Sequence, residues 1–338
     1  MRVGDNPNKN QPIQDSDYVH QVIIPVYIPN QEDFFKESFT ILTNCLDSLF
    51  KTCHAKTYFT VVNNGSCKEI ADYLDQLLKD KKIHELIHTS AIGKLNSILK
   101  GLAGHTIKLV TITDSDVLFL NNWQSETVAV FNSFPKTGVV GIVPQFKMFV
   151  SNCGNVILEN LFSSNLKFTT VKNPNALIRF YDSIWEIKVY NTDYLKLSLS
   201  ITSKNNTALV GSCHFVATYR KELFDEIVTY IGFKMGASSE GYLDDAPLKK
   251  GYWRLTTEDN HAYHMGNRTE LWMQQEIEQL TNDNYEHCKL IATKILPNKS
   301  RLNLIVKNKL FPKLFSSKRV KNIFYRLKKL PKSMIKEY

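Results

Sequence analysis

Apolar runs alternate with amphipathic segments along the first 120 residues, and this alternation constrains the fold more than any other feature. Residues 22–28 (VIIPVYI) and 58–64 (YFTVVNN) are nearly continuous apolar runs, which is typical of strands buried on both faces of a parallel sheet. Between them, residues 34–52 repeat apolar side chains with the period of a helix. Because strands separated by helices build βαβ units, we predict an α/β domain with a mostly parallel, Rossmann-like sheet flanked by helices.

The alternation continues to residue 116. We predict helices at 67–82 and 93–104 and strands at 83–89 and 107–116. In a sheet of this kind the ligand site lies beyond the carboxyl ends of the strands. Three of the strands are followed there by polar residues, namely Tyr27 with Pro29, residues 63–66 (NNGS) and residues 114–116 (DSD). We therefore expect these three segments to line one crevice.

The pattern is less regular beyond residue 120. Residues 137–146 predict a strand, and residues 208–227 predict a strand followed by a helix. Residues 240–267 contain two adjacent acids, a helix-like segment, a short strand and a histidine. Residues 145–205 carry no motif, so the sequence gives no indication of specificity there.

Two carboxylates stand one residue apart at the end of the predicted strand at 107–116. Asp114 and Asp116 are both ionised at neutral pH, and an unpaired carboxylate is costly to bury beside an apolar strand. Mn²⁺ or Mg²⁺ would compensate, because these ions prefer oxygen ligands and bind substrate phosphates as well. The alternative is a solvated turn at the end of a strand, which needs no ligand.

The NNGS segment offers further polar groups to the same crevice. Asn63 and Asn64 carry amide donors and acceptors suited to a base or a ribose. Gly65 allows a positive φ or a close approach of the backbone to a ligand. The alternative interpretation is an ordinary Asn-Gly turn.

Acids and a histidine recur near the end of the irregular region. Asp244 and Asp245 are adjacent, so their side chains diverge; one is expected to face the crevice as a base, and the other to cap a helix. His264 ends a short predicted strand and is a possible metal ligand, although a lone histidine is more often structural.

The positive charge is concentrated at the carboxyl end. The chain has a net charge of +9, and residues 294–338 hold fourteen Lys or Arg but one acid, which leaves the remainder slightly acidic. A uniformly basic nucleic-acid binder would not show this distribution, so we expect no nucleic-acid partner. Ile323, Phe324, Leu327 and Leu330 predict one apolar face of a basic helix, suited to an anionic membrane surface. The alternative is a basic tail that packs on the acidic globule or binds a partner protein.

The six cysteines and the amino-terminal residues bear on the compartment. No CxxC pair occurs, and the spacing of the cysteines suggests neither a zinc site nor a disulfide framework. The first residues lack the apolar region of a secretory signal, and no run reaches the ~20 apolar residues that span a bilayer. We predict a cytoplasmic protein that is peripheral at the inner face of the cytoplasmic membrane.

The order of these segments resembles the family 2 glycosyltransferases, which have a GT-A fold. The matching pieces are IIPVYI (23–28), VVNNGS (61–66), the helix with Lys94 and Asn96, TDSD (113–116), GFK (232–234), DDAPL (244–248) and YHMGN (263–267). This resemblance divides the chain into a polar leader (1–19), a GT-A domain (20–270) and a helical, basic extension (271–338).

The resemblance implies a role for each matching residue. The nucleotide of the donor would be flanked by Pro25, Tyr27, Asn63, Asn64, Gly65 and Lys94. Asp114 and Ser115 would contact its ribose or sugar, and Asp116 would bind the metal on its diphosphate, with Asp114 as a second metal ligand. Asp245 would be the catalytic base beside Asp244, and His264 would bind the metal or the diphosphate.

The resemblance also implies the activity. It is the transfer of a sugar from a UDP- or GDP-type donor to a glycan or a lipid-linked acceptor, as in the biosynthesis of surface polysaccharides. An inverting reaction is expected, and a retaining one is the alternative. The chain departs from the family where Asn63 or Asn64 replaces an Asp, where Asp244 replaces a Glu, and where residues 245–251 form a shortened segment.

Two other classes of function remain open. A nucleotidyltransferase would place a glycine-rich, basic loop after the first strand, whereas residues 29–35 (PNQEDFF) hold no glycine and no basic residue. A non-catalytic scaffold protein with the same fold is the second alternative.

Overall fold

The structure is a computed structural model. The residues that it describes are 4, 9 and 16–338, apart from 185–189, 204–205, 227, 236–240, 282–288, 292–299 and 337. Most of the predicted leader, and parts of residues 145–205 and 271–338, therefore lie outside the described residues.

Strands and helices alternate through the first part of the chain. The strands are β1 (His20–Val26), β2 (Thr57–Asn63), β3 (Glu85–His88), β4 (Leu109–Thr113), β5 (Val117–Phe119), β6 (Thr137–Gly141), β7 (Leu166–Thr170), β8 (Leu197–Ser203), β9 (Asn206–Val210), β10 (Val216–Arg220), β11 (Trp253–Thr257) and β12 (Ala262–His264). The α-helices are α1 (Ser38–Thr52), α2 (Lys68–Lys79), α3 (Lys94–Leu102), α4 (Trp123–Ser133), α5 (Gly154–Glu159), α6 (Pro174–Ile184), α7 (Gly241–Lys249), α8 (Leu271–Gln279), α9 (Arg301–Ile305), α10 (Phe311–Phe315) and α11 (Lys318–Leu327). Short 3₁₀ segments are η1 (Asp33–Phe35), η2 (Met148–Val150), η3 (Thr192–Leu195) and η4 (Lys221–Phe224), and η5 (Val306–Leu310) is a π-helix.

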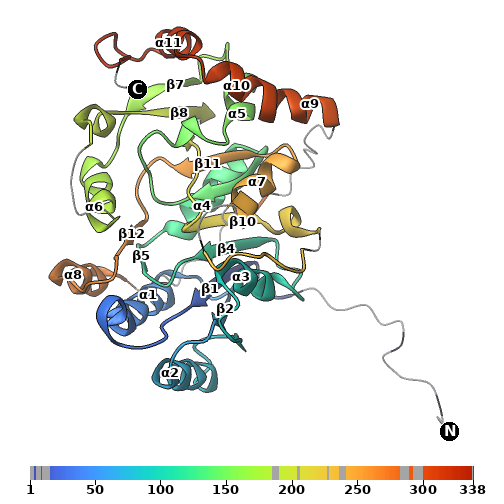
Figure 1. The fold of residues 1–338 in the computed structure, drawn as a ribbon, viewed down its shortest axis with the longest axis vertical. Coiled ribbons are helices and arrows are strands. Elements are labelled where there is room, and N and C mark those ends of the chain that lie inside the picture. Colours follow the sequence, from blue (N-terminus) through green and yellow to red (C-terminus); the bar gives the residue numbers. More distant parts are fainter. Residues whose placement is uncertain are drawn as a thin grey trace.

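One large sheet organises the described part of the chain (Figure 1). Its strand order is β3-β2-β1-β4-β10-β6-β11-β9-β8-β7, and β12 pairs with β5 in a separate two-stranded sheet. The pairs among β3, β2, β1 and β4 are all parallel, as predicted from the continuous apolar runs. Three strands of the large sheet, β7, β9 and β10, run against the others. The predicted α/β fold is confirmed.

The segment at 208–227 differs from its prediction. It was expected to be a strand and a helix, but its described residues, 208–226, hold the end of β9, the whole of β10 and only the 3₁₀ turn η4. Strand β10 inserts antiparallel between β4 and β6, where Thr111 and Thr218 share a hydrogen bond of 2.6 Å between their hydroxyl groups. The reason for the difference is a pairing between residues about a hundred positions apart, which a local pattern does not encode.

Strand β1 is buried on both faces. Val22 and Ile24 pack with side chains of α1 and α2 on one face, whereas Ile23 packs with Leu95 and Ile98 of α3 on the other. A different cluster fills the far half of the sheet, between α4, α5 and the strands β7, β8 and β9. The sheet therefore has a covered face on each side, and its strand ends remain the accessible edge.

The carboxyl-terminal helices are part of that far cluster. Phe311, Phe315, Phe324 and Tyr325 are all buried within it, and so is Leu330. The predicted single membrane face of α11 is therefore wrong, because Phe324 and Leu330 pack inward while Ile323 and Leu327 are exposed. None of the described helices is long and apolar enough to cross a membrane.

Candidate active site

The DSD segment forms the turn that links β4 to β5. The Asp114 N–H donates to the Phe215 carbonyl at 2.8 Å, just before β10, and the Met265 N–H donates to the Asp116 carbonyl at 2.8 Å, just after β12. These two bonds hold the turn between segments that follow it by about a hundred residues or more. The turn thus lies at the carboxyl end of β4, where the sequence predicts the crevice.

Asp114 forms an ion pair with Lys94. Lys94 is the first residue of α3, and its Nζ lies 2.5 Å from Asp114 Oδ1. The backbone N–H of Lys94 donates to the Lys234 carbonyl at 3.0 Å. Gly93 precedes it with φ 92°, and a Cβ there would lie 2.9 Å from the Cα of Lys234. A glycine is therefore required for the 232–234 segment to pack against the start of α3.

Asp116 faces His264. The Nε2 of His264 lies 3.4 Å from Asp116 Oδ2, and its Nδ1 lies 2.8 Å from the Ser183 hydroxyl at the end of α6. The pairing of β12 with β5 sets this contact, because it places His264 opposite Val117, the neighbour of Asp116. Ser183 thereby fixes the orientation of the imidazole ring.

The other oxygen of Asp116 lacks a partner. Within the described residues, Asp116 Oδ1 is buried and receives no hydrogen bond. Burial raises the pKa of Asp116, and the neighbouring His264 and Lys94 act in the opposite direction. A divalent cation would satisfy this oxygen, so the residues present fit such an ion.

The protein alone supplies few ligands for that ion. The described residues contain no group of three or more His, Cys, Asp or Glu side chains placed to hold a metal. Asp116 and His264 are the adjacent pair, whereas Asp114 is engaged by Lys94. Ions such as Mg²⁺ commonly bind through one or two carboxylates, with substrate phosphates and water completing the shell.

The NNGS turn is held by its own amide side chains. Asn63 Oδ1 accepts from the Ser66 N–H at 2.9 Å, and Asn64 Oδ1 accepts from the Ile92 N–H at 2.9 Å. Gly65 has φ 87°, the positive value expected of it, and a Cβ there would lie 2.9 Å from the Ala91 nitrogen. These amides position the loop that leads into α3.

The remaining predicted donor residues lie along the same edge. Pro25 is buried in β1, beyond the last β1–β4 pair at Ile23 and Ile112, so its missing N–H removes no bond to β4. Tyr27 is 44% exposed at the end of β1, and Ser115 is half-buried in the DSD turn.

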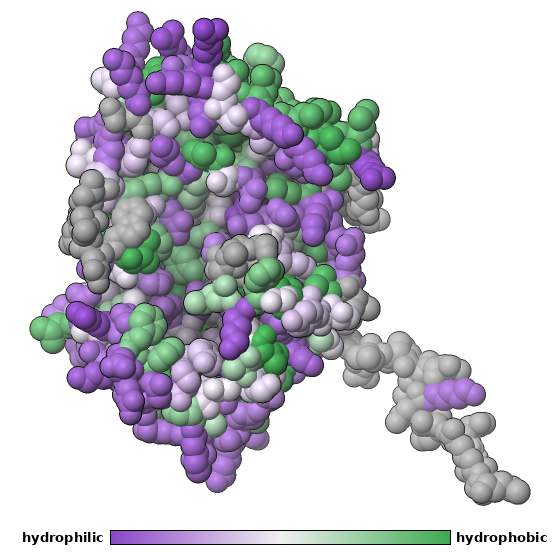
Figure 2. Space-filling view, in the orientation of Figure 1, coloured by the Kyte–Doolittle hydropathy of each residue, from purple (hydrophilic) through white to green (hydrophobic). Residues whose placement is uncertain are grey.

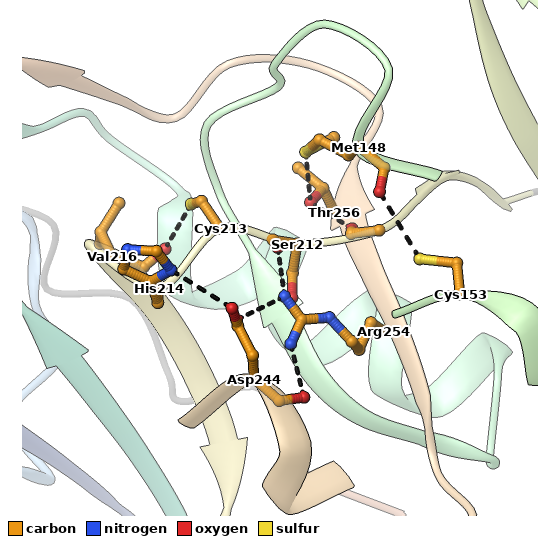
Figure 3. Close-up of polar contacts among 10 residues, drawn as sticks. Met148, Cys153, Ser212, Cys213, His214, Val216, Asp244, Arg254 and Thr256 are labelled. Carbon is orange, nitrogen blue, oxygen red and sulfur yellow. Dashed lines mark hydrogen bonds and ion pairs between the residues drawn. The ribbon is translucent and has the colours of Figure 1, made fainter. Parts of the chain in front are cut away.

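The two acids of α7 have different surroundings, and Figure 3 shows those of Asp244. Asp244 Oδ1 accepts from Arg254 Nη2 at 2.7 Å, and its Oδ2 lies 3.6 Å from His214 Nδ1. Arg254 also donates to the carbonyls of Asp244 and Ser212, at 2.7 and 2.6 Å. Burial opposes ionisation of Asp244, but the neighbouring His214 and the charge of Arg254 outweigh it and hold the pKa of Asp244 below its ordinary value. Asp245, the next residue, is exposed.

Three residues of the site are absent from the sequence predictions, namely Ser183, His214 and Arg254. The sequence could have indicated Arg254, because it is a charged residue inside the short strand β11 (WRLTT). The structure shows that it is only 4% exposed. His214 lies within the segment that was predicted as strand and helix, and Ser183 lies in the region without a motif, so neither had one.

The family model described as glycosyl transferase family 2 matches residues 22–227, which is more than half of the chain. The chain belongs to this glycosyltransferase family. The family match and the sheet described above confirm the predicted GT-A resemblance. Comparison with curated proteins gives no match.

The solved structures that are similar to this chain include three with a bound nucleotide or nucleotide sugar. They are the mannosyltransferase PcManGT from Pyrobaculum calidifontis with GDP-Man and Mn²⁺ (15% identity, TM-score 0.39), TarS residues 1–349 from S. aureus with UDP-GlcNAc (17%, 0.43) and GalNAc-T7 with UDP, GalNAc and Mn²⁺ (11%, 0.47). The alignments cover 74%, 75% and 73% of this family 2 chain. It covers 59%, 60% and 44% of theirs, so it spans less than two thirds of their lengths.

Proposed function

We propose that this family 2 enzyme transfers a sugar from a UDP- or GDP-sugar to a hydroxyl of a glycan or a lipid-linked acceptor, with inversion at the anomeric carbon. The observation that carries the proposal is the buried, unpartnered Oδ1 of Asp116 beside His264, at the carboxyl end of β4. Asp116 and His264 would hold Mn²⁺ or Mg²⁺ there. The ion would supply positive charge against the diphosphate leaving group.

The donor would bind along the edge formed by β1, β2 and β4. Tyr27 and Gly65 would contact its nucleoside, beside the turn that Asn63 holds, and Lys94 with Asp114 and Ser115 would contact its sugar and phosphates. Lys94 supports this placement because it is already directed at Asp114. Its charge would shift toward the diphosphate when the donor arrives.

Asp245 would act as the base. It would accept the proton of the acceptor hydroxyl while that oxygen bonds to the anomeric carbon and the bond to the diphosphate breaks, with the electron pair leaving on the phosphate oxygen. Two observations support Asp245 over Asp244: Asp245 is exposed, and the carboxylate of Asp244 is occupied by Arg254 and His214. We assign Asp244 to the support of helix α7.

The place of the reaction belongs to the same proposal. A lipid-linked acceptor of surface-polysaccharide synthesis would bring the enzyme to the inner face of the cytoplasmic membrane. The basic charge of residues 294–338 supports this, since anionic lipids attract such segments.

The test is a screen of nucleotide sugars, with thermal shift followed by product analysis. A donor that binds the native state raises its melting temperature, and we expect a UDP- or GDP-sugar to do so only with Mn²⁺ or Mg²⁺ present. Release of nucleoside diphosphate during turnover supports the transferase. Release of pyrophosphate would instead indicate a nucleotidyltransferase, and full turnover in EDTA would contradict the metal site.

A further inference from the structure

The helix formed by α9, η5 and α10 is apolar on two faces. On the inner face, Phe311 and Phe315 are buried in the far core. On the outer face, exposed apolar side chains recur every four residues: Leu302 (73% exposed), Val306 (37%), Leu310 (56%) and Leu314 (60%). We call these four residues the outer stripe. A helix that is apolar on both faces is expected to be covered on both, by protein or by a membrane.

The inner face is fixed in place, so the outer stripe cannot turn inward. Lys307 Nζ lies 2.7 Å from Glu159 Oε1, and Asn308 Nδ2 donates to the Leu248 carbonyl at 3.0 Å. Gly154 of α5 contacts the backbone at Lys307 so closely that an added Cβ would lie 2.6 Å from its carbonyl oxygen. These contacts orient the helix and leave the outer stripe in solvent.

Exposed basic side chains lie on the helix of the outer stripe and on the segment that follows it, residues 316–336. They are Arg301, Lys309, Lys313, Lys318, Arg319, Arg326, Lys329, Lys332 and Lys336. The sequence from 301 to 336 contains no Asp or Glu. Figure 2 shows hydrophobic side chains gathered over α9 and α10, with hydrophilic ones beside them. The surface therefore requires a partner that is negatively charged and has an apolar layer beneath its charges.

We propose that the outer stripe docks on the surface of an anionic lipid bilayer. The four stripe residues would enter the boundary between headgroups and acyl chains, and the flanking lysines would remain among the headgroups. Ile323 (66% exposed) and Leu327 (50%) are further exposed apolar side chains on the adjoining α11. This inference deepens the membrane part of the proposed function, on which it rests for its biological purpose, but it replaces the predicted face of α11 with a different helix.

The experiment is co-sedimentation of the full chain with vesicles of phosphatidylcholine alone or mixed with phosphatidylglycerol. We expect salt-sensitive binding to the mixed vesicles. The variant Lys309→Gln/Lys313→Gln/Lys318→Gln should bind about a hundredfold more weakly, since each basic residue near an anionic surface contributes about 1 kcal/mol. The variant Leu302→Gln/Leu310→Gln/Leu314→Gln should bind at least about tenfold more weakly, because it removes apolar burial.

The control is Leu271→Gln, which changes a leucine on α8 that is more exposed (85%) than any in the outer stripe and should leave vesicle binding unchanged. All variants should keep the wild-type melting temperature and the turnover of a water-soluble donor, so a failure of docking is distinguishable from a failure of the transferase proposal. Equal binding to both kinds of vesicle, or wild-type binding by both triple variants, would overturn the inference. So would stripe-dependent self-association or binding to polyglutamate in place of vesicle binding, which would assign the stripe to a second copy or to an acidic protein.

Discussion

The DSD turn and helix α7 each present an acid to the candidate site, and the two acids have different partners. Within the described residues, Asp116 keeps a buried oxygen without a hydrogen bond, whereas Asp244 is contacted by both Arg254 and His214. An unsatisfied buried carboxylate costs stability in the absence of a ligand, and a satisfied one contributes to it. The comparison teaches that two aspartates can be assigned different roles from their hydrogen bonds. A buried oxygen without a partner indicates a ligand-binding role, and a fully contacted carboxylate indicates a structural one.

The largest effect that would test this contrast is expected at Asp116. Asp116→Asn should lower kcat/KM by about 10³-fold, because it removes the negative charge that would hold the metal ion beside the leaving group. The free energy of unfolding, measured in urea, should stay unchanged or rise slightly, since a raised pKa means that the ionised form is disfavoured in the native state. A variant that keeps wild-type turnover would remove Asp116 from the metal site.

Asp245→Asn should give the next largest effect. We expect turnover to fall by about 10²-fold with donor affinity nearly unchanged, because the base acts on the acceptor. The side chain is exposed, so the urea midpoint should not move. If Asp244→Asn gives this kinetic phenotype while Asp245→Asn remains active, the two roles on α7 are exchanged.

Asp244→Asn should instead lower stability, by about 2 kcal/mol, because Arg254 would keep its buried charge without a counter-charge. The pKa of Asp244 is depressed in the folded state, so its contribution is present above the ordinary pKa and disappears as pH falls through the lower native value. Wild-type and variant unfolding free energies should therefore differ at pH 7 and converge in acid. A constant difference across this range would contradict the ion pair.

Ser183→Ala should have the smallest effect. Loss of the hydroxyl removes the 2.8 Å contact that orients His264, and changes in such supporting contacts typically weaken metal binding by about tenfold. Titration of Mn²⁺ by its effect on melting temperature would measure this. The control is Ser125→Ala in α4, whose hydroxyl donates to the carbonyl three residues before it, as that of Ser183 does. An unchanged Mn²⁺ midpoint would show that Ser183 does not support metal binding through His264.

The sequence predicts the strands β1, β2 and β4 better than it predicts β10. Strands β1, β2 and β4 fall within a few residues of their predicted positions, because each is a continuous apolar run beside an amphipathic helix. The place of β10 depends on partners a hundred residues away, and no period in the sequence encodes that pairing.

The site divides in the same way. The family resemblance implies that Asp116 and His264 lie close together, since it makes both of them metal ligands, whereas the ion pair of Asp114 with Lys94 was not predicted. The distinction between Asp244 and Asp245 could not be predicted, because it depends on Arg254. The pairing of β11 in the sheet brings Arg254 beside α7, and this tertiary contact leaves no local signal at the two aspartates.

The burial of residues 324–335 has a consequence for how the molecule is made. Tyr325, Leu330, Met334 and Ile335 complete the core around β7 and β8, and the hydroxyl of Tyr338 donates to the Leu197 carbonyl at 2.6 Å. During synthesis, strands β1, β2 and β4 can pair early. The apolar face of the sheet around β7 and β8 stays exposed until these later residues have been made. A ribosome that stalls in the last turn of α11 would therefore leave an aggregation-prone nascent chain. Cleavage by a protease at the same place would remove the residues that complete the core around β7 and β8.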